Sequence, residues 1–468
     1  MNEVAVIDQH FNNRLVKLVS DPAAPFSIAG NSFVTAYEDQ DGVLWLCTPG
    51  GISKTYGVRS LFRVHRLGNF VPVLKSNNHI TQMATDTANG SLWLITIDRQ
   101  VIQYFPSNGS YRIYDLNQAR PPGWDPANGV LSYVRLIDDK VLVCTTLGIY
   151  ELNPGTGAIK PHRPLPSPFS HLNPVDVVSS DNRLFYYVAL GKVLMYNKST
   201  KQATLLPNLS EETVKMKPGA AYLNVRAGQP MWMYVGNGWI VGYANGKMDS
   251  VCIISDPINE SYGYVNWMDT DLKGNIWISF NGVGLYKYDP AARAITHYSQ
   301  AEGMRDNAVA VAVADGFGNV WSGDRHQYQV LISKTGYFYT FSVPLHQQNA
   351  SWYLKMVLMK NGHMAAGAFQ DLVEFFPDRL LQKPVVQAPV FSGVEVGGKM
   401  RMLTDDKTLR LEPDDNSFVV RFGLLTDREL FPYELQWKLD AFEKDWQQGT
   451  TALRPCTTNC LPANTLFG

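Results

Sequence analysis

The sequence lacks any excess of one charge, with 41 Lys and Arg residues against 42 Asp and Glu residues and a formal net charge of −1. A nucleic-acid partner is therefore not expected, because binding to a polyanion needs a basic face. No stretch approaches the ~20 apolar residues of a membrane-spanning helix. The first residues, MNEVAVIDQHFNN, have neither the basic start nor the apolar core of a signal peptide. We expect any attachment to a membrane to come from segments outside this sequence.

Cysteine is also scarce, and the five cysteines are Cys47, Cys144, Cys252, Cys456 and Cys460. Only the last two are close in sequence, and without further ligands they do not make a metal site. The nine histidines show no metal-binding spacing, and no Gly-x-Ser-x-Gly turn or phosphate loop is present. We expect no metal, no cofactor and no catalytic residue.

The sequence is rich in turn formers and aromatic residues, with 37 glycines, 27 prolines and 12% aromatics, which favours many short strands. One unit, seen in DLKGNIWISFNGVGLYKYDP at 271–290, recurs along the chain every 43 to 49 residues. The residues at the tryptophan position of its second strand are Trp45, Trp93, Leu142, Phe185, Trp232, Trp277, Trp321 and Met364. A period of about 45 residues with four short strands is typical of a β-propeller blade.

A single unit can be followed through residues 262–298. The turn at Lys273, Gly274 and Asn275 supplies the positive φ that a tight hairpin needs, and the next strand places Trp277 where a blade packs on its neighbour. Cys47 and Cys144 occupy one shared position of their units, which fits small apolar residues in crowded strands.

The fold class predicted is all-β: a seven-bladed β-propeller at 57–383, with an eight-bladed ring as the alternative. The unit around Met364 lacks a fourth strand, and LFRVHRL at 61–67 can supply it and so close the ring. Residues 1–56 then read as partial blades from the end of a preceding propeller.

The period stops after Pro384, and residues 384–468 carry the alternating pattern of a partial immunoglobulin-like β-sandwich. Pro384 and Pro389 mark the linker. The tail TTALRPCTTNCLPANTLFG fits neither module, so this domain is expected to be incomplete at its C-terminal end.

GNIWISFNGVGLYKYDPAARAITHYSQAEGMRDNAV resembles the two-component regulator propeller repeat, and DQDGVLWLCTPGGISK at 39–54 matches the same core. NSFVVRF at 416–422 and KLDAFEKDW at 438–446 resemble the three-tyrosine domain that follows such propellers. The units at Leu142, Phe185 and Met364 lack the core tryptophan. CTTNCLPANTLFG departs from the usual end of the three-tyrosine domain, as a frameshift or truncated reading frame would produce.

The resemblance implies the periplasmic sensor portion of a hybrid two-component histidine kinase. Such a domain would recognise a carbohydrate, signal as a homodimer through the C-terminal domain, and contain no enzyme of its own. Two alternatives remain open: a propeller lyase acting on a polysaccharide or a small cyclic molecule, and a non-catalytic protein-interaction propeller. A lyase would need His, Tyr or Arg side chains gathered at the central mouth.

In propellers, ligands meet the loops that enter the first strand and the loops between the second and third strands. Aromatic faces stack on sugar rings, while Arg and Gln offer fixed hydrogen-bond donors. The candidate ligand-binding residues on these loops are Tyr264, Arg305, Arg325, His326, Trp352 and Gln370. Arg325 and His326 replace the usual Gly-Thr turn and are the leading candidates, whereas Arg305 and Trp352 also fit structural positions.

Overall fold

The structure is a computed structural model. It describes residues 4–8, 14–18, 20, 28–38, 44–55, 62–74, 78–163, 165–180, 182–188, 192–206, 222–224, 230–236, 238–244, 247–254, 265–280, 282–323, 327–342, 354–368, 370–381, 390–401, 417–423, 435–438, 444–449 and 455–457. The chain divides into two compact units: residues 1–19, 28–59 and 380–468 form unit 1, and residues 20–27 and 60–379 form unit 2. The domain boundaries predicted at 56/57 and 383/384 and the proline linker fall outside the described residues.

Unit 2 consists of four-stranded antiparallel sheets, seven of which are present among the described residues. The first three are β7–β10 (Ile80–Thr85, Leu92–Thr96, Gln100–Phe105, Ser110–Asp115), β11–β14 (Leu131–Ile137, Lys140–Thr145, Gly148–Leu152, Ile159–Pro161) and β15–β18 (Asp176–Ser180, Arg183–Tyr187, Val193–Asn197, Gln202–Leu205). The next three are β19–β22 (Tyr222–Asn224, Met231–Gly236, Trp239–Ala244, Lys247–Cys252), β23–β26 (Val265–Thr270, Ile276–Phe280, Gly284–Asp289, Ala294–Tyr298) and β27–β30 (Val311–Ala314, Val320–Gly323, Gln327–Leu331, Phe338–Ser342). The seventh combines β31 (Lys355–Leu358), β32 (Met364–Ala368) and β33 (Asp371–Phe375) with β6 (Phe62–Arg66).

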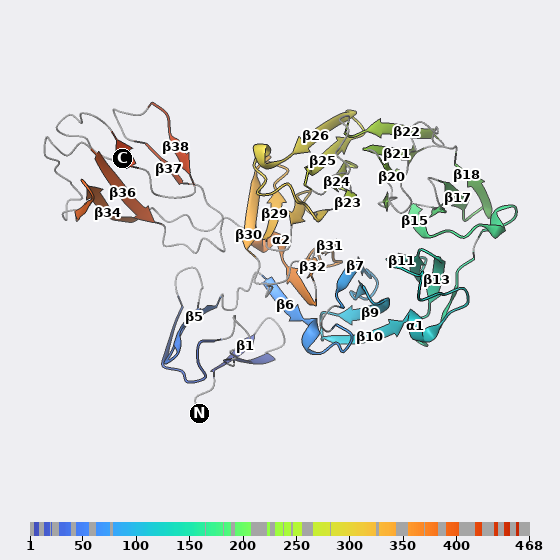
Figure 1. Cartoon of the computed structure of the whole chain (residues 1–468), viewed down its shortest axis with the longest axis horizontal. Coiled ribbons are helices and arrows are strands. Elements are labelled where there is room, and N and C mark those ends of the chain that lie inside the picture. The colour runs from blue at the N-terminus through green and yellow to red at the C-terminus, as the bar shows by residue number, and fades with distance from the viewer. Residues whose placement is uncertain are drawn as a thin grey trace. The chain divides into compact units, whose positions relative to one another are not determined.

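The sheets follow one another around a closed ring (Figure 1). Each first strand packs on the first strand of the next sheet, from β7 through β11, β15, β19, β23 and β27 to β31, and β31 packs back on β7. We call these seven strands the first-strand ring. The all-β propeller class predicted from the sequence is confirmed, and the total blade number of the chain stays a prediction.

The residues predicted to anchor each second strand do so in all seven sheets of unit 2. Trp93, Leu142, Phe185, Trp232, Trp277, Trp321 and Met364 lie on β8, β12, β16, β20, β24, β28 and β32, and each is 4% exposed or less. Leu142, Phe185 and Met364 therefore fill the tryptophan position without a tryptophan. Cys144 on β12 is completely buried, as expected of a small apolar residue, whereas Cys47 is half-buried.

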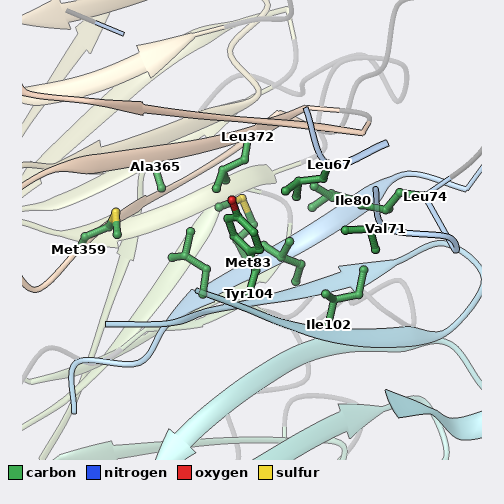
Figure 2. Close-up of a cluster of buried hydrophobic side chains, with 12 residues drawn as sticks. Leu67, Val71, Leu74, Ile80, Met83, Ile102, Tyr104, Met359, Ala365 and Leu372 are labelled. Atoms are coloured by element: carbon green, nitrogen blue, oxygen red, sulfur yellow. The ribbon is translucent and has the colours of Figure 1, made fainter. Parts of the chain in front are cut away.

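The ring closes through β6, as the sequence predicted. β6 pairs antiparallel with β33, so that Phe62 lies opposite Phe375 and Arg66 opposite Asp371. The seventh sheet then packs on the first through a buried apolar cluster, which is shown in Figure 2. The cluster joins Met359, Ala365 and Leu372 to residues of the first sheet that include Met83 and Tyr104.

The turn between the first and second strands is held by a buried aspartate in two neighbouring sheets. Asp271 accepts hydrogen bonds from the backbone N–H groups of Lys273 and Asn275 at 2.9 Å each, from the Asn275 amide at 2.8 Å and from the Trp277 indole at 2.9 Å. Gly274 supplies the predicted positive φ of 84°. The recurring Asp, Gly, Asn and Trp therefore form one hydrogen-bonded unit, since a single carboxylate satisfies four donors.

Asp315 repeats this arrangement, whereas the first sheet lacks the hydrogen bond between the turn aspartate and the indole. Asp315 accepts from the backbone N–H groups of residues 317 and 319, from the Asn319 amide and from the Trp321 indole at 2.9 Å. In the first sheet the turn is one residue longer, and Asp86 bonds Ala88 and Asn89 instead. The indole nitrogen of Trp93 is consequently buried without a hydrogen-bond partner.

A buried polar cluster ties β6 to the neighbouring strands where the ring closes. His65 on β6 lies 2.7 Å from the Tyr104 hydroxyl and 3.4 Å from Glu374 on β33, and His363 lies 2.8 Å from the other Glu374 oxygen. Burial alone raises the pKa of Glu374, but hydrogen bonds from His363 and His65 and the charges of those rings outweigh burial and lower the pKa to about 2.

Unit 1 contains the strands expected at its N-terminal end: the hairpin β1 (Val4–Asp8) and β2 (Arg14–Leu18), and the sheet β3 (Thr35–Glu38), β4 (Leu44–Thr48) and β5 (Gly51–Thr55). Its C-terminal part has a sheet in the order β35 (Lys399–Arg401), β34 (Val390–Val396), β36 (Ser417–Gly423) and β39 (Pro455–Thr457), and the pair β37 (Leu435–Trp437) and β38 (Gln447–Gly449). The immunoglobulin-like character of this part stays a prediction, and Cys460 lies outside the described residues.

The aspartate turns make a first testable prediction. Asp315→Ala leaves four donors without their acceptor, three of them buried, and we expect it to lower the free energy of unfolding by about 3 kcal/mol. Asp86→Ala is the matched control, because Asp86 is half-buried and bonds no indole, and its cost should be about 1 kcal/mol. Urea unfolding of the two variants measures the difference, and equal losses would contradict the role of the carboxylate.

The closure cluster makes a second prediction, on acid stability. A carboxyl group whose pKa falls on folding stabilises the fold above its unfolded pKa, and this contribution disappears as pH falls toward the folded value. Relative to Glu374→Gln, the wild type should therefore lose roughly 2–3 kcal/mol of unfolding free energy between about pH 5 and pH 2. Urea titrations of both proteins across this range provide the measurement, and parallel pH profiles would show that Glu374 contributes nothing through its charge.

Candidate ligand-binding site

The predicted ligand-binding residues divide into two that the structure describes and four that it does not. Arg305 lies between β26 and β27, on a loop entering a first strand, and Gln370 lies between the second and third strands of the seventh sheet. Tyr264, Arg325, His326 and Trp352 lie outside the described residues, so their roles stay predictions.

Arg305 belongs to a loop whose backbone is held by glutamines. Its N–H donates to the Gln329 side chain at 3.2 Å, and its carbonyl accepts from the Gln300 side chain at 2.9 Å. The residue itself is exposed. The loop is therefore fixed while the guanidinium group points to solvent, where it can reach a ligand.

Gln370 is half-buried and packs against the segment that follows β6. Its carbonyl accepts a hydrogen bond from the Gly68 N–H at 3.1 Å, and a Cβ atom at Gly68 would lie 2.6 Å from the Gln370 side-chain oxygen. Gln370 thus has a structural role in the ring closure, and the structure forms no hydrogen bond between Gln370 and Arg305.

A residue that the sequence did not single out occupies the first-strand ring. Lys355 is the first residue of β31 and is 7% exposed. Its ammonium nitrogen lies 5.2 Å from the ring centroid of Trp267 on β23. The strand between them, β27, carries only valine and alanine, so no large side chain separates the two residues.

Lys355 has no carboxylate partner among the described residues. Burial away from water disfavours its ammonium form and lowers the pKa of Lys355 to about 8. A face-on aromatic ring attracts a cation, but less strongly than a carboxylate does. The ammonium group is therefore buried away from water, and the Trp267 ring compensates only part of its charge.

Another buried cation of the same ring shows the contrast. Arg135 on β11 makes two hydrogen bonds of 3.0 and 2.8 Å to Asp176 at the start of β15. Burial lowers the pKa of Arg135, but the adjacent Asp176 carboxylate outweighs burial and raises it. The first-strand ring therefore holds Arg135, which is paired with a carboxylate, and Lys355, which has no carboxylate partner in the part of the chain that the structure describes.

A concave place lies between the fifth and sixth sheets, at the turns that follow their first strands. A cavity of 190 Å³ is lined there by residues that include Asp271, Trp277, Lys287, Phe317 and Ser333. Phe317 is 63% exposed, whereas the Asp271 carboxylate is already saturated by the turn. This cavity offers the Phe317 ring for an apolar contact and Lys287, whose ammonium nitrogen lies 5.8 Å from the Trp277 ring centroid.

Comparison with solved structures identifies the class of fold. The extracellular domain of BT3049 from B. thetaiotaomicron, assigned as a hybrid two-component system, superposes with a TM-score of 0.64 and 16% identity over 98% of this chain and 61% of that chain. Two structures of the extracellular domain of BT4673 from the same organism, assigned as a one-component system in one and a hybrid two-component system in the other, give TM-scores of 0.53 and 0.52 with 14% and 13% identity.

The chain therefore has the fold of these extracellular domains, and it spans about 61% of the length of the BT3049 domain. No family model matches the sequence, and no curated protein matches it. Among the described residues, no helix is long and apolar enough to cross a membrane, and no three His, Cys, Asp or Glu side chains gather as a metal site.

Sequence reasoning missed Lys355, although one signal was present. Lys355 interrupts the otherwise apolar run SWYLKMVLM, which directly precedes the second strand of the unit around Met364. In a first strand that is enclosed by neighbouring sheets, a charged residue inside such a run is expected to be buried rather than to face solvent.

The environment of Lys355 makes a third prediction. Below about pH 8 the amine is charged in both states and the fold bears the cost of burying the charge. Between pH 8 and the ordinary lysine value the folded protein releases its proton first, so stability rises with pH. Relative to Lys355→Met, the wild type should gain up to about 3 kcal/mol of unfolding free energy over this range.

The matched control is Lys360→Met, which changes an exposed lysine next to the β31–β32 turn. Its pH profile in urea unfolding should follow that of the wild type. A Lys355→Met profile that also runs parallel to the wild type between pH 7 and 10.5 would contradict the unpaired burial of Lys355.

Proposed function

We propose that the chain is the ligand-sensing part of the ectodomain of a two-component signal transduction histidine kinase. It recognises a carbohydrate in the periplasm and performs no catalysis itself; the kinase belongs to the parent protein. The observation that carries this proposal is the superposition on the BT3049 extracellular domain, which covers 98% of the chain and therefore includes both units.

The geometry of unit 2 supports a binding role. The side chains of its strands are used in packing between neighbouring sheets. The loops that enter the first strands carry exposed groups, such as the Arg305 guanidinium, on a backbone held by hydrogen bonds. Binding side chains on loops above a rigid scaffold are a common arrangement in recognition domains. A ligand held there changes an equilibrium only if it favours one arrangement of the protein over another.

We further propose that the parent protein is a homodimer joined through its C-terminal domain, and that the ligand acts by changing the geometry of that dimer. The paired strands β34, β35 and β36 form a sheet, and we assign the dimer interface to it.

A thermal-shift screen of the chain against neutral and acidic oligosaccharides tests the sensing role. A bound ligand stabilises the folded state by about 2.7 kcal/mol at one hundred times its Kd, so the unfolding midpoint should rise with ligand concentration. Chromatography of the same mixtures should return the oligosaccharide intact. A shortened product would contradict a sensor and favour the lyase alternative.

Dimer signalling is tested separately in the full-length parent protein. Cross-linking of the C-terminal domains should give a different pattern with and without the oligosaccharide found in the screen. An unchanged pattern would refute the proposed relay while leaving ligand binding intact.

A further inference from the structure

The contact between Lys355 and Trp267 contains two hydrogen-bond donors and no acceptor. The indole nitrogen of Trp267 is buried and has no hydrogen-bond partner. The Lys355 ammonium is in contact with the same indole and has no carboxylate partner in the described part of the chain. Buried donors are nearly always paired in folded proteins, so a buried ammonium beside a buried indole N–H, with no acceptor among the described residues, indicates a place for an acceptor from outside the described part of the chain.

The strands around Lys355 provide no competing charge. β7, β27 and β32 pack on β31, and their sequences ITQMAT, VAVA and MAAGA contain no titratable residue. The carboxylate in β23 is Asp269, which accepts hydrogen bonds from the backbone N–H groups of Thr270 at 2.8 Å and Ala314 at 3.2 Å. Asp269 is therefore engaged with the backbone of β23 and β27.

The missing acceptor must carry a negative charge to match this site. A neutral hydroxyl oxygen can accept one hydrogen bond but leaves the buried ammonium charge uncompensated, whereas an oxyanion compensates the charge and has lone pairs for both donors. We propose that Lys355 and Trp267 form a binding site in the first-strand ring for the oxyanion group of a saccharide, either a uronate carboxylate or a sulfate ester.

This inference rests on the proposed function only in taking the ligand to be a saccharide. The site selects acidic over neutral sugars, because its interaction with the anion takes place where little water competes. Binding also weakens as the amine loses its proton, so affinity for the anion falls as pH rises from 7 to 10.

The experiment is isothermal titration calorimetry on the full 468-residue chain at constant ionic strength. The probes are glucuronate, glucose 6-sulfate, sodium sulfate and glucose. The wild type and the control variant Lys360→Met should bind at least one sugar oxyanion, with glucose undetected. Lys355→Met should weaken that binding at least tenfold, and Trp267→Phe, which removes the indole donor, should weaken it severalfold.

The arms separate the sources of the anion. Binding of glucuronate alone supports a carboxylate site, and binding of glucose 6-sulfate alone supports a sulfate-ester site. If sodium sulfate binds as tightly as the sugar probes, the oxyanion site is supported and the sugar ring contributes nothing to the affinity. If Lys355→Met does not fold, the test uses Lys355→Arg and the wild type, each titrated from pH 7 to pH 10. The affinity of the wild type for the anion should fall over this range, whereas that of Lys355→Arg should not, because a guanidinium group keeps its charge to pH 10.

Two results would overturn the inference: no oxyanion probe binds the wild type, or Lys355→Met binds as tightly as the wild type. Neither result affects the proposed sensing function, which stands if a neutral oligosaccharide raises the unfolding midpoint equally in the wild type and in Lys355→Met. Conversely, if an oxyanion binds at Lys355 and the cross-linking pattern of the dimer does not change, the proposed dimer relay is refuted and the proposed anion site is supported.

Discussion

Unit 2 depends on the pairing of β6 with β33. A four-stranded sheet of this kind is apolar on both faces and can bury them only between two neighbours, so a linear row would always leave two faces in water. The apolar clusters run from sheet to sheet around the ring, and the Phe375 ring on β33 packs at a tilt against Trp321 and Tyr328 of the sixth sheet. When β6 pairs with β33, the seventh sheet is complete and packs on the first sheet, so that the apolar faces of these two sheets cover each other.

The arrangement of the ring could be predicted from the sequence because the regular spacing of the second strands along the chain indicates that equivalent sheets pack side by side. The second strands at Leu142, Phe185 and Met364 were found without a tryptophan, since the interval between blades is set by the length of four strands and three turns. The closing strand at 61–67 was also found, because the unit around Met364 lacked an outer strand and an unassigned strand preceded the unit around Trp93. By contrast, no sequence pattern indicated that the turn aspartates Asp271 and Asp315 accept a hydrogen bond from the tryptophan of the next strand. That contact depends on the turn length, as the longer turn at Asp86 shows.

The site was much less predictable. Loop position alone suggested six residues, and of the two described, Arg305 is free to bind whereas Gln370 serves the closure. Lys355 was missed because its character is set by three different sheets: β31 carries it, the small residues of β27 leave its path open, and β23 supplies Trp267. Side chains brought together from strands about ninety residues apart leave no local pattern in one sequence.

The β6–β33 pairing also has a consequence for biosynthesis. His65 and Glu374, which meet at this seam, are 309 residues apart. At 5–20 residues per second, a ribosome needs roughly 15–60 s to add the chain between them. For most of that interval, once β10 has been made, the nascent first sheet exposes the apolar face that β32 and β33 later cover. Such high contact order makes ring closure a late and slow event. Nascent chains of this architecture are therefore natural clients for chaperones until the last blade is made.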